Sequence, residues 1–169
     1  MQTLLPDCSV RKLQPVNADI EKIYAMASQN TLFYQYHPPF VTWQSILDDM
    51  SALPPGKTMA DKFYIGFFDG AALAAVVDMI LAYPNETTGY IGFFMVDKSR
   101  QGQGIGSRIL ADIENTMRNN GMCHSRLAVD KGNPQSYSFW TKNGYAVCGP
   151  EIPNDFSAYI PMQKELTPL

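Results

Sequence analysis

The sequence contains 169 residues, and 13 lysine and arginine residues against 16 aspartate and glutamate residues give a formal net charge of −3 at pH 7. A chain of this length buries enough surface to form a core without disulfides or a structural metal, so we expect one domain over residues 1–169. The apolar fraction of 46% excludes a disordered chain. The acidic balance and the lack of a basic run exclude the charged surface of a duplex-DNA-binding protein, so we expect no nucleic-acid partner.

The three cysteines, Cys8, Cys123 and Cys148, are odd in number and show no Cys-x-x-Cys spacing. They predict neither a disulfide framework nor a zinc site, and we expect no metal. The longest apolar stretch, residues 71–77, is interrupted by Asp78 and is too short to span a bilayer. No basic stretch followed by an apolar block marks a signal peptide, so we expect a cytoplasmic location and no membrane partner, and we leave a homodimer open.

Two amphipathic helices are expected in the first third of the chain. The first follows Asn17, a suitable N-cap, with apolar residues at helical spacing: Ile20, Ile23, Tyr24 and Ala27. The second is predicted from Thr42 until the prolines at positions 54 and 55 end it. The link between the two helices is expected to be a loop, and it is unusually aromatic: it contains Phe33, Tyr34, Tyr36 and His37.

The period changes to that of β-strands from Lys62 onward. Strands are predicted over residues 63–68 and 71–82, joined by the hairpin dipeptide at positions 69 and 70. A turn at residues 83–85 then precedes a nearly continuous apolar strand over residues 90–96. The first half of the chain is therefore predicted to be two helices and an antiparallel meander.

A helix and a strand follow this meander in the order of a crossover connection. The helix has one apolar face, formed by Ile105, Ile109, Leu110, Ile113 and Met117, and Gly121 ends it. The next strand is predicted over residues 126–129. A strand, a helix and a strand in this order predict a right-handed crossover, so this strand should lie parallel to the strand over residues 90–96.

The remaining residues predict a short helix and two closing strands. Asn133 is a suitable N-cap for this helix, which is expected to end at Gly144. The closing strands are predicted over residues 145–148 and 156–163. Pro161 cannot donate a ladder hydrogen bond, so we expect the last strand to be an edge strand or a shorter one.

The segment between the apolar strand and the long helix is rich in glycine, and reads Gln101-Gly102-Gln103-Gly104-Ile105-Gly106-Ser107. Glycine lets the backbone approach a ligand, and a helix N-terminus offers N–H groups and a partial positive charge to phosphate oxygens. A P-loop would require Gly-Lys-Ser/Thr, and the lysine is missing. A dinucleotide-binding fingerprint does not suit a strand that comes from an antiparallel meander. A third kind of phosphate-binding turn is therefore indicated.

The pattern Gln101-x-x-Gly104-x-Gly106 resembles the Gln/Arg-x-x-Gly-x-Gly/Ala motif of the GNAT superfamily of N-acetyltransferases. Further resemblances to that family are Val96 and Asp97 before the motif, Asn133, and the phrase Phe-Trp-Thr-Lys-Asn-Gly-Tyr at residues 139–145. The order of helices and strands over nearly the whole chain is also similar to that of the family. The resemblance implies an α/β (α+β) fold with a mixed, mostly antiparallel sheet, a central parallel pair of splayed strands, and flanking helices.

The resemblance implies acetyl-CoA as the cosubstrate. In the family, the pantetheine arm binds the exposed edge of the strand before the motif, and the glycine turn binds the pyrophosphate. The residues expected to bind the cosubstrate are Phe94, Met95, Val96, Gln101, Gly102, Gly104, Gly106, Ser107, Asn133 and Trp140.

The catalytic groups depart from the family pattern. Trp140 stands where the family often has a tyrosine that protonates the leaving thiolate, and an indole N–H is no general acid. Tyr137 lies three residues earlier, on nearly the same helical face, and is our candidate for this catalytic role. Solvent could also protonate the thiolate. The general base is left open among Asp78, Glu86, His37 and His124, and the variable substrate wall of the family would contain Tyr34, Tyr36 and His37.

We therefore expect an acetyl-CoA-dependent N-acetyltransferase that transfers the acetyl group directly, in a ternary complex, to a primary amine of a small molecule or peptide. The alternative is a CoA-binding regulatory or sensory module with weak catalysis, which Trp140 and the open choice of base favour. A dinucleotide-binding oxidoreductase is a more distant alternative. The sequence does not identify the amine.

Overall fold

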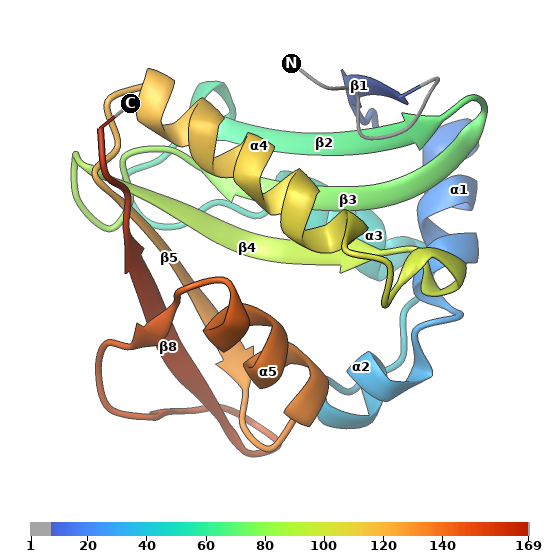
Figure 1. The fold of residues 1–169 in the computed structure, drawn as a ribbon. Coiled ribbons are helices and arrows are strands. Elements are labelled where there is room, and N and C mark those ends of the chain that lie inside the picture. The colour runs from blue at the N-terminus through green and yellow to red at the C-terminus, as the bar shows by residue number, and fades with distance from the viewer. Residues whose placement is uncertain (1–7, 169) are drawn as a thin grey trace.

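The computed structural model describes residues 8–168. The helices and strands in chain order are β1 (Cys8–Lys12), α1 (Asn17–Ala27), α2 (Thr31–Tyr36), α3 (Trp43–Ser51), η1 (Met59–Asp61), β2 (Lys62–Asp69), β3 (Ala72–Ile80), β4 (Thr88–Val96), η2 (Lys98–Arg100), α4 (Ile105–Asn119), β5 (His124–Asp130), α5 (Pro134–Lys142), β6 (Ala146–Val147), β7 (Ile152–Pro153) and β8 (Ala158–Glu165). The strands form one sheet in the order β1-β2-β3-β4-β5-β8-β6, with β7 paired to β8. The predicted mixed sheet with flanking helices is confirmed (Figure 1).

The sheet is antiparallel except at its centre, where β4 and β5 run parallel. These two strands pair only over their first halves, from Thr88 with His124 to Ile91 with Leu127. Beyond Ile91 they diverge, and Figure 1 shows the two strands opening like a V with α5 beside the gap. The second half of β4 therefore pairs with β3 alone, and its other edge is open.

An irregularity in β4 marks the point where the strands separate. Asp78 of β3 pairs with Phe93, whereas Met79, the next residue, pairs with Ile91, so Gly92 is an extra residue in β4. Such a bulge bends and twists the strand that carries it. The bulge thus helps to turn the second half of β4 away from β5.

Helices cover both faces of the sheet, and each face has its own core. On one face, α4 and α5 pack through residues such as Ile109, Met117 and Trp140. On the other face, α1 and α3 pack through residues such as Ile23 and Ile46. Figure 1 shows α4 and α5 in front of the sheet and α3 behind it.

The structure corrects three expectations about local structure. The aromatic link over residues 31–36 is a short helix, α2, which has no buried residue and so carries little periodic signal. Residues 8–12 form an edge strand that was not expected. The last strand, β8, is not an edge strand, because it lies between β5 and β6.

Pro161 fits inside the sheet for a local reason. Its carbonyl accepts the hydrogen bond of the Cys148 backbone N–H, so this residue faces the β6 side of β8. β6 is only two residues long and ends at Val147. A backbone N–H at position 161 would point toward β6. Because β6 is so short, the missing donor of Pro161 costs the sheet few hydrogen bonds.

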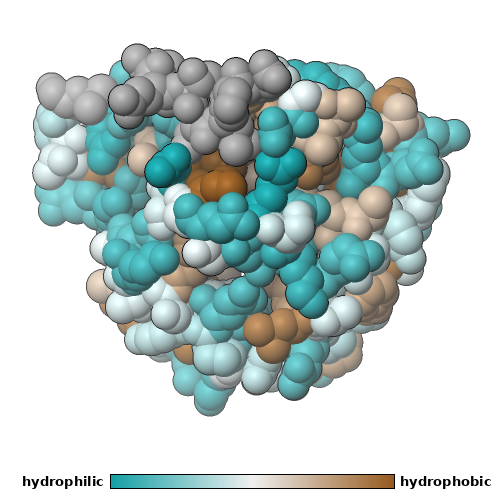
Figure 2. Space-filling model, turned by 45° about the vertical axis from the view of Figure 1, so that its right-hand side comes forward, coloured by the Kyte–Doolittle hydropathy of each residue, from teal (hydrophilic) through white to brown (hydrophobic). Residues whose placement is uncertain are grey.

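The face turned forward in Figure 2 is mostly hydrophilic, with hydrophobic residues in small separate patches. Large apolar side chains that are exposed, such as Val10, Trp43 and Phe156, come from distant parts of the chain. Scattered apolar residues of this kind are normal on a protein surface. No helix within residues 8–168 is both long and apolar enough to cross a membrane.

Candidate active site

The glycine turn leaves the first N–H groups of α4 without a side-chain cap. Asp97 caps the short helix η2, where its side chain accepts a hydrogen bond from the Ser99 backbone N–H at 3.0 Å. The next cap position, before α4, is Gly104, which makes no side-chain hydrogen bond. The leading N–H groups of a helix need an outside acceptor, and the macrodipole favours an anion there. The start of α4 is therefore suited to bind phosphate oxygens.

Two glycines of this turn adopt a backbone conformation that other residues rarely adopt. Gly102 and Gly104 have φ angles of +74° and +77°, and a Cβ built on either would meet no atom within 4 Å. These two glycines thus shape the turn and keep open the space beside it. Gly106 has a different role, because a Cβ there would lie 3.1 Å from the Phe139 ring. Gly106 lets α4 lie close to α5.

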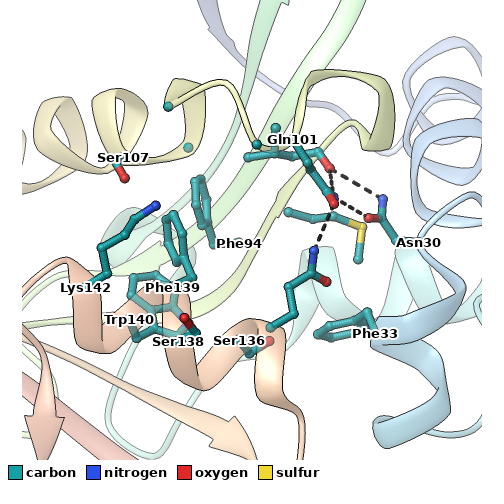
Figure 3. Close-up of a pocket in the computed structure, with 16 residues that line it drawn as sticks. Asn30, Phe33, Phe94, Gln101, Ser107, Ser136, Ser138, Phe139, Trp140 and Lys142 are labelled. Atoms are coloured by element: carbon teal, nitrogen blue, oxygen red, sulfur yellow. Dashed lines mark hydrogen bonds between the residues drawn. The ribbon is translucent and has the colours of Figure 1, made fainter.

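A cavity of about 360 Å³ lies between this turn, the open edge of β4 and α5 (Figure 3). Nine of the ten residues predicted to bind the cosubstrate line it: Phe94, Met95, Val96, Gln101, Gly102, Gly104, Gly106, Ser107 and Trp140. The sequence analysis missed further lining residues, namely Asn30, Phe33, Gln135, Ser136, Ser138, Phe139 and Lys142. Lys142 is exposed, and Figure 3 shows its ammonium group directed toward the start of α4, where it adds positive charge.

A chain of side-chain amides crosses one end of this cavity. Gln101 Nε2 donates to Asn30 Oδ1 at 2.6 Å and to the Val96 carbonyl at 2.9 Å, and Gln135 Nε2 donates to Gln101 Oε1 at 3.1 Å (Figure 3). These hydrogen-bonded amides connect the region after α1, the glycine turn and the start of α5. The Gln101 amide is thus engaged by protein groups.

The tenth predicted residue, Asn133, lies outside the cavity lining and is only 2% exposed. Its side chain caps α5, because Oδ1 accepts hydrogen bonds from the backbone N–H groups of Gln135 and Ser136. A contact between Asn133 and the cosubstrate stays a prediction.

Trp140 and Tyr137 occupy different surroundings. Trp140 is 7% exposed and packs against the rings of Phe94, Phe139 and Tyr145, with centroid distances of 5.8, 5.0 and 5.0 Å. Tyr137 is 44% exposed and lines neither this cavity nor the one described next. An acid role for Tyr137 stays a prediction, and it would require the phenol to reach the thiolate from outside the cavity lining.

A second cavity, of about 250 Å³, lies on the other side of the splayed strands. It shares four lining residues with the first, Phe33, Phe94, Ser136 and Trp140, so the two cavities adjoin. We call the second cavity the acceptor chamber. Its polar lining includes three carboxylates and one imidazole: Asp49 from α3, Asp78 from β3, Asp130 from β5 and His37 from the end of α2.

His37 and Asp130 form a close pair in this chamber. Nδ1 of His37 lies 3.0 Å from both carboxylate oxygens of Asp130. This hydrogen bond raises the pKa of His37 above its usual value, and partial burial opposes the change. In neutral His37 the ring proton therefore belongs on Nδ1, which leaves Nε2 as the nitrogen that can accept a proton.

Asp78 is held by a buried lysine. Lys62 Nζ donates to Asp78 Oδ2 at 2.8 Å and to the Ala52 carbonyl at 2.9 Å, just after the end of α3. Burial raises the pKa of Asp78, although Lys62 opposes this effect. The second oxygen of Asp78, Oδ1, is buried and has no hydrogen-bond partner among the described residues.

The other predicted wall and base residues lie elsewhere. Tyr34 packs against the Phe33 and Phe40 rings outside both cavities, and burial raises its pKa to about 12. Tyr36 faces Gly132, where a Cβ would lie 3.5 Å from the tyrosine ring. Among the predicted wall and base candidates, the structure places only His37 and Asp78 in the chamber, whereas Tyr34, Tyr36, Glu86 and His124 do not line it.

Comparison with known proteins agrees with this architecture. The family model described as acetyltransferase (GNAT) family matches residues 21–145. No curated protein matches the sequence. Among solved structures, an acetyltransferase from Thermus thermophilus aligns with a TM-score of 0.73 and 15% identity over 96% of this chain and 99% of that one. Ard1 from Thermoplasma volcanium aligns with a TM-score of 0.71 and 21% identity over 95% and 99% of the two chains.

A third similar structure was solved with a bound ligand. The PaiA N-acetyltransferase from Thermoplasma acidophilum, in complex with coenzyme A, aligns with a TM-score of 0.68 and 20% identity over 94% of this chain and 98% of that one. These identities are low, so the similar structures support the fold alone. The family is shown by the family model, which matches most of the sequence. The chain therefore belongs to the GNAT family of acetyltransferases, whose cosubstrate is acetyl-CoA.

Proposed function

We propose that this protein transfers the acetyl group of acetyl-CoA directly to a primary amine of a small molecule or peptide, within a ternary complex. The observation that carries this proposal is the shared wall of the two cavities, formed by Phe33, Phe94, Ser136 and Trp140. One cavity begins at the anion-binding start of α4, and the other is lined by carboxylates that attract an ammonium group. Two substrates could thus meet at the splay of the strands.

The first cavity suits acetyl-CoA along its length. The start of α4, with Gly104 and Ser107, and the ammonium group of Lys142 would hold the pyrophosphate. The open edge of β4, from Phe94 to Val96, would hold the pantetheine arm through backbone groups that β3 does not use, other than the Val96 carbonyl, which accepts a hydrogen bond from Gln101. The thioester would then lie near Phe94 and Trp140, where the chamber begins.

His37 is the group that we propose as general base. A primary ammonium has a pKa near 10.4 and is mostly charged at neutral pH, so it must lose a proton before it can attack. Nε2 of His37 would accept that proton, while Asp130 holds the ring by Nδ1 and stabilises the imidazolium that forms. Because the pKa of His37 is raised, the neutral base becomes abundant at a higher pH than it would for an ordinary histidine.

The chemical step follows from the meeting of the two substrates. The amine nitrogen attacks the thioester carbonyl carbon, a C–N bond forms, and a backbone N–H at the open edge of β4 stabilises the oxyanion. The nitrogen releases its second proton to solvent, the C–S bond breaks, and the CoA thiolate leaves and takes a proton from Tyr137 or from solvent. None of the three cysteines, Cys8, Cys123 and Cys148, lines either cavity, which supports direct transfer over an acyl-cysteine intermediate.

The competing function is a CoA-binding regulatory module. The exposed position of Tyr137 and the indole at position 140 favour it, because neither places a phenol at the thioester. The decisive experiment measures thiol release from acetyl-CoA with a panel of amines and peptides, after thermal shifts with acetyl-CoA, CoA, NAD and GTP. Stabilisation by acetyl-CoA together with amine-dependent thiol release is expected. Stabilisation without thiol release from any acceptor would favour the regulatory module.

A further inference from the structure

We propose that the acceptor is a small diamine, whose second, non-reacting ammonium group is bound by Asp49 at the rim of the acceptor chamber and by the buried carboxylate of Asp78. This inference rests on the proposed transfer to a primary amine and specifies the substrate of that same chamber. Its basis is the charge balance, the unpartnered atoms and the size of the chamber.

The chamber holds more negative than positive charge. Asp78 is paired with Lys62 at 2.8 Å, and Asp130 with His37 at 3.0 Å. The carboxylate of Asp49 forms no hydrogen bond or ion pair with any residue that the structure describes, although Asp49 lines the same chamber. When His37 is neutral, as a general base must be before the reaction, three carboxylates face the single ammonium of Lys62. Three carboxylates then face one cation within the described part of the chain, and Asp130 has only the hydrogen bond from neutral His37.

The second observation concerns a single buried oxygen. Asp78 is 9% exposed, and its Oδ1 atom has no hydrogen-bond partner within the described part of the chain. A buried carboxylate oxygen without a donor is costly, and such atoms in folded proteins call for a ligand or another specific partner. An ammonium group offers up to three donors, so a bound cation would satisfy this atom.

The four charged groups come from four different elements. Asp130 and His37 come from β5 and from the end of α2, whereas Asp49 and Asp78 come from α3 and β3. Lys62 links the second pair, because it binds Asp78 and also the Ala52 carbonyl just beyond α3. Because His37 and Asp130 are hydrogen-bonded to each other, they take the proton from the reacting nitrogen, and Asp49 and Asp78 are left to hold the ammonium that stays.

The size and walls of the chamber fit a compact molecule. Its volume of about 250 Å³ lies below the 300–1,000 Å³ that is typical of pockets for drug-sized ligands. Aromatic side chains complete the lining: Phe33, Tyr90, Phe93, Phe94, Trp140 and Tyr159. Aromatic faces attract cations and also accommodate a methylene chain. A short apolar chain with an amine at each end matches this combination.

The test compares two acceptors with the same four-carbon chain, butylamine with one amine and putrescine with an amine at each end, at saturating acetyl-CoA. We expect the kcat/KM for putrescine to exceed that for butylamine by about tenfold, the usual size of one hydrogen bond to a charged group. Asp49→Asn removes the charge at an exposed position and should bring the ratio of the two kcat/KM values toward one. Mass spectrometry should find one acetyl group on each product molecule.

Asp48→Asn is the matched control. Asp48 is the preceding residue on the same helix, its carboxylate accepts a hydrogen bond from Gln44 at 2.8 Å, and it lines neither cavity. This variant should keep the wild-type ratio. Equal kcat/KM values for the two amines, an unchanged ratio in Asp49→Asn, or a peptide acceptor used faster than putrescine would each overturn the diamine proposal while leaving amine transfer intact.

Calorimetry separates the two proposals if no acceptor supports thiol release. Binding of putrescine and of butylamine is then measured with CoA present, in the wild type and in both variants. Tighter binding of putrescine that is lost in Asp49→Asn and kept in Asp48→Asn would support the diamine site and contradict the proposed transfer. Equal binding of both amines would contradict the diamine site.

Discussion

Lys62→Met should strongly destabilise the fold, because it removes the only cation paired with the carboxylate of Asp78 within residues 8–168. The Lys62 side chain is 1% exposed, that of Asp78 is 13% exposed, and their polar atoms are 2.8 Å apart. Methionine keeps much of the unbranched stem and loses the charge. Removing one partner of a buried ion pair costs about 3–5 kcal/mol, because the other charge stays buried without compensation. Asp78 Oδ1 already lacks a partner, so no second contact offsets this loss.

The assay is urea unfolding followed by circular dichroism. With a urea m value of about 2 kcal/mol per molar, the expected loss lowers the midpoint by about 2 M. The double variant Lys62→Met/Asp78→Leu should recover most of this loss, because two matched apolar side chains often replace a buried ion pair at little cost. Lys131→Met is the control, since Lys131 and Glu151 form an ion pair with both side chains 51% exposed, and its midpoint should hardly change.

The loss of stability in Lys62→Met should also depend on pH, and it should grow as the pH rises. Burial raises the pKa of Asp78 in the folded protein, and the loss of Lys62 raises it further. The unfolded chain therefore releases this proton at lower pH than the folded one, so the variant loses stability as the pH rises above the unfolded value near 3.9. A midpoint shift below about 0.5 M at neutral pH, or an equal shift in acid, would refute the burial argument.

Three further predictions concern the site. Gly104→Val places a branched side chain at a φ of +77°, so it should cost about 1–2 kcal/mol of stability and raise the Kd for acetyl-CoA in calorimetry. An unchanged Kd would show that the glycine turn does not bind acetyl-CoA. The kcat/KM should rise with pH through the raised pKa of His37. Asp130→Asn replaces the charged acceptor of the His37 hydrogen bond with a neutral amide, so it should move this rise to lower pH; a profile that does not move would exclude the pair as base. Tyr137→Phe should lower kcat by about 10²-fold if the phenol protonates the thiolate, whereas a loss under about threefold would leave solvent as the donor.

The residues that line the first cavity could be predicted in large part because their signals are local. The strand before the motif, the positive-φ glycines at positions 102 and 104, and the apolar face of α4 lie within one continuous segment. Each is encoded by residues a few positions apart, through period or through backbone conformation. The contact of the Gln101 amide with Asn30 could not be predicted in this way, because Asn30 lies far away in the sequence.

Of the second cavity, only His37 and Asp78 were among the candidates from the sequence, because this cavity is assembled from long-range contacts. Asp49 and Asp130 are brought to one chamber by α3 and β5, and neither lies in a local motif. Asp78 interrupts an apolar strand, a pattern more typical of an outward-facing residue. Its inward position depends on Lys62, and the register of β2 against β3 brings the two side chains together.

The position of β8 has a consequence for the synthesis of the protein. Residues 158–165 are made after every other strand, yet they lie between β5 and β6. Until then β5 has only the short pairing with β4, and an unpaired strand edge can pair with other chains. All residues lining the larger cavity precede position 143, whereas the acceptor chamber needs Tyr159 from β8. A nascent chain thus contains all residues of the larger cavity first, and a ligand that binds this cavity, as we propose for acetyl-CoA, favours folding by mass action before the last strand is in place.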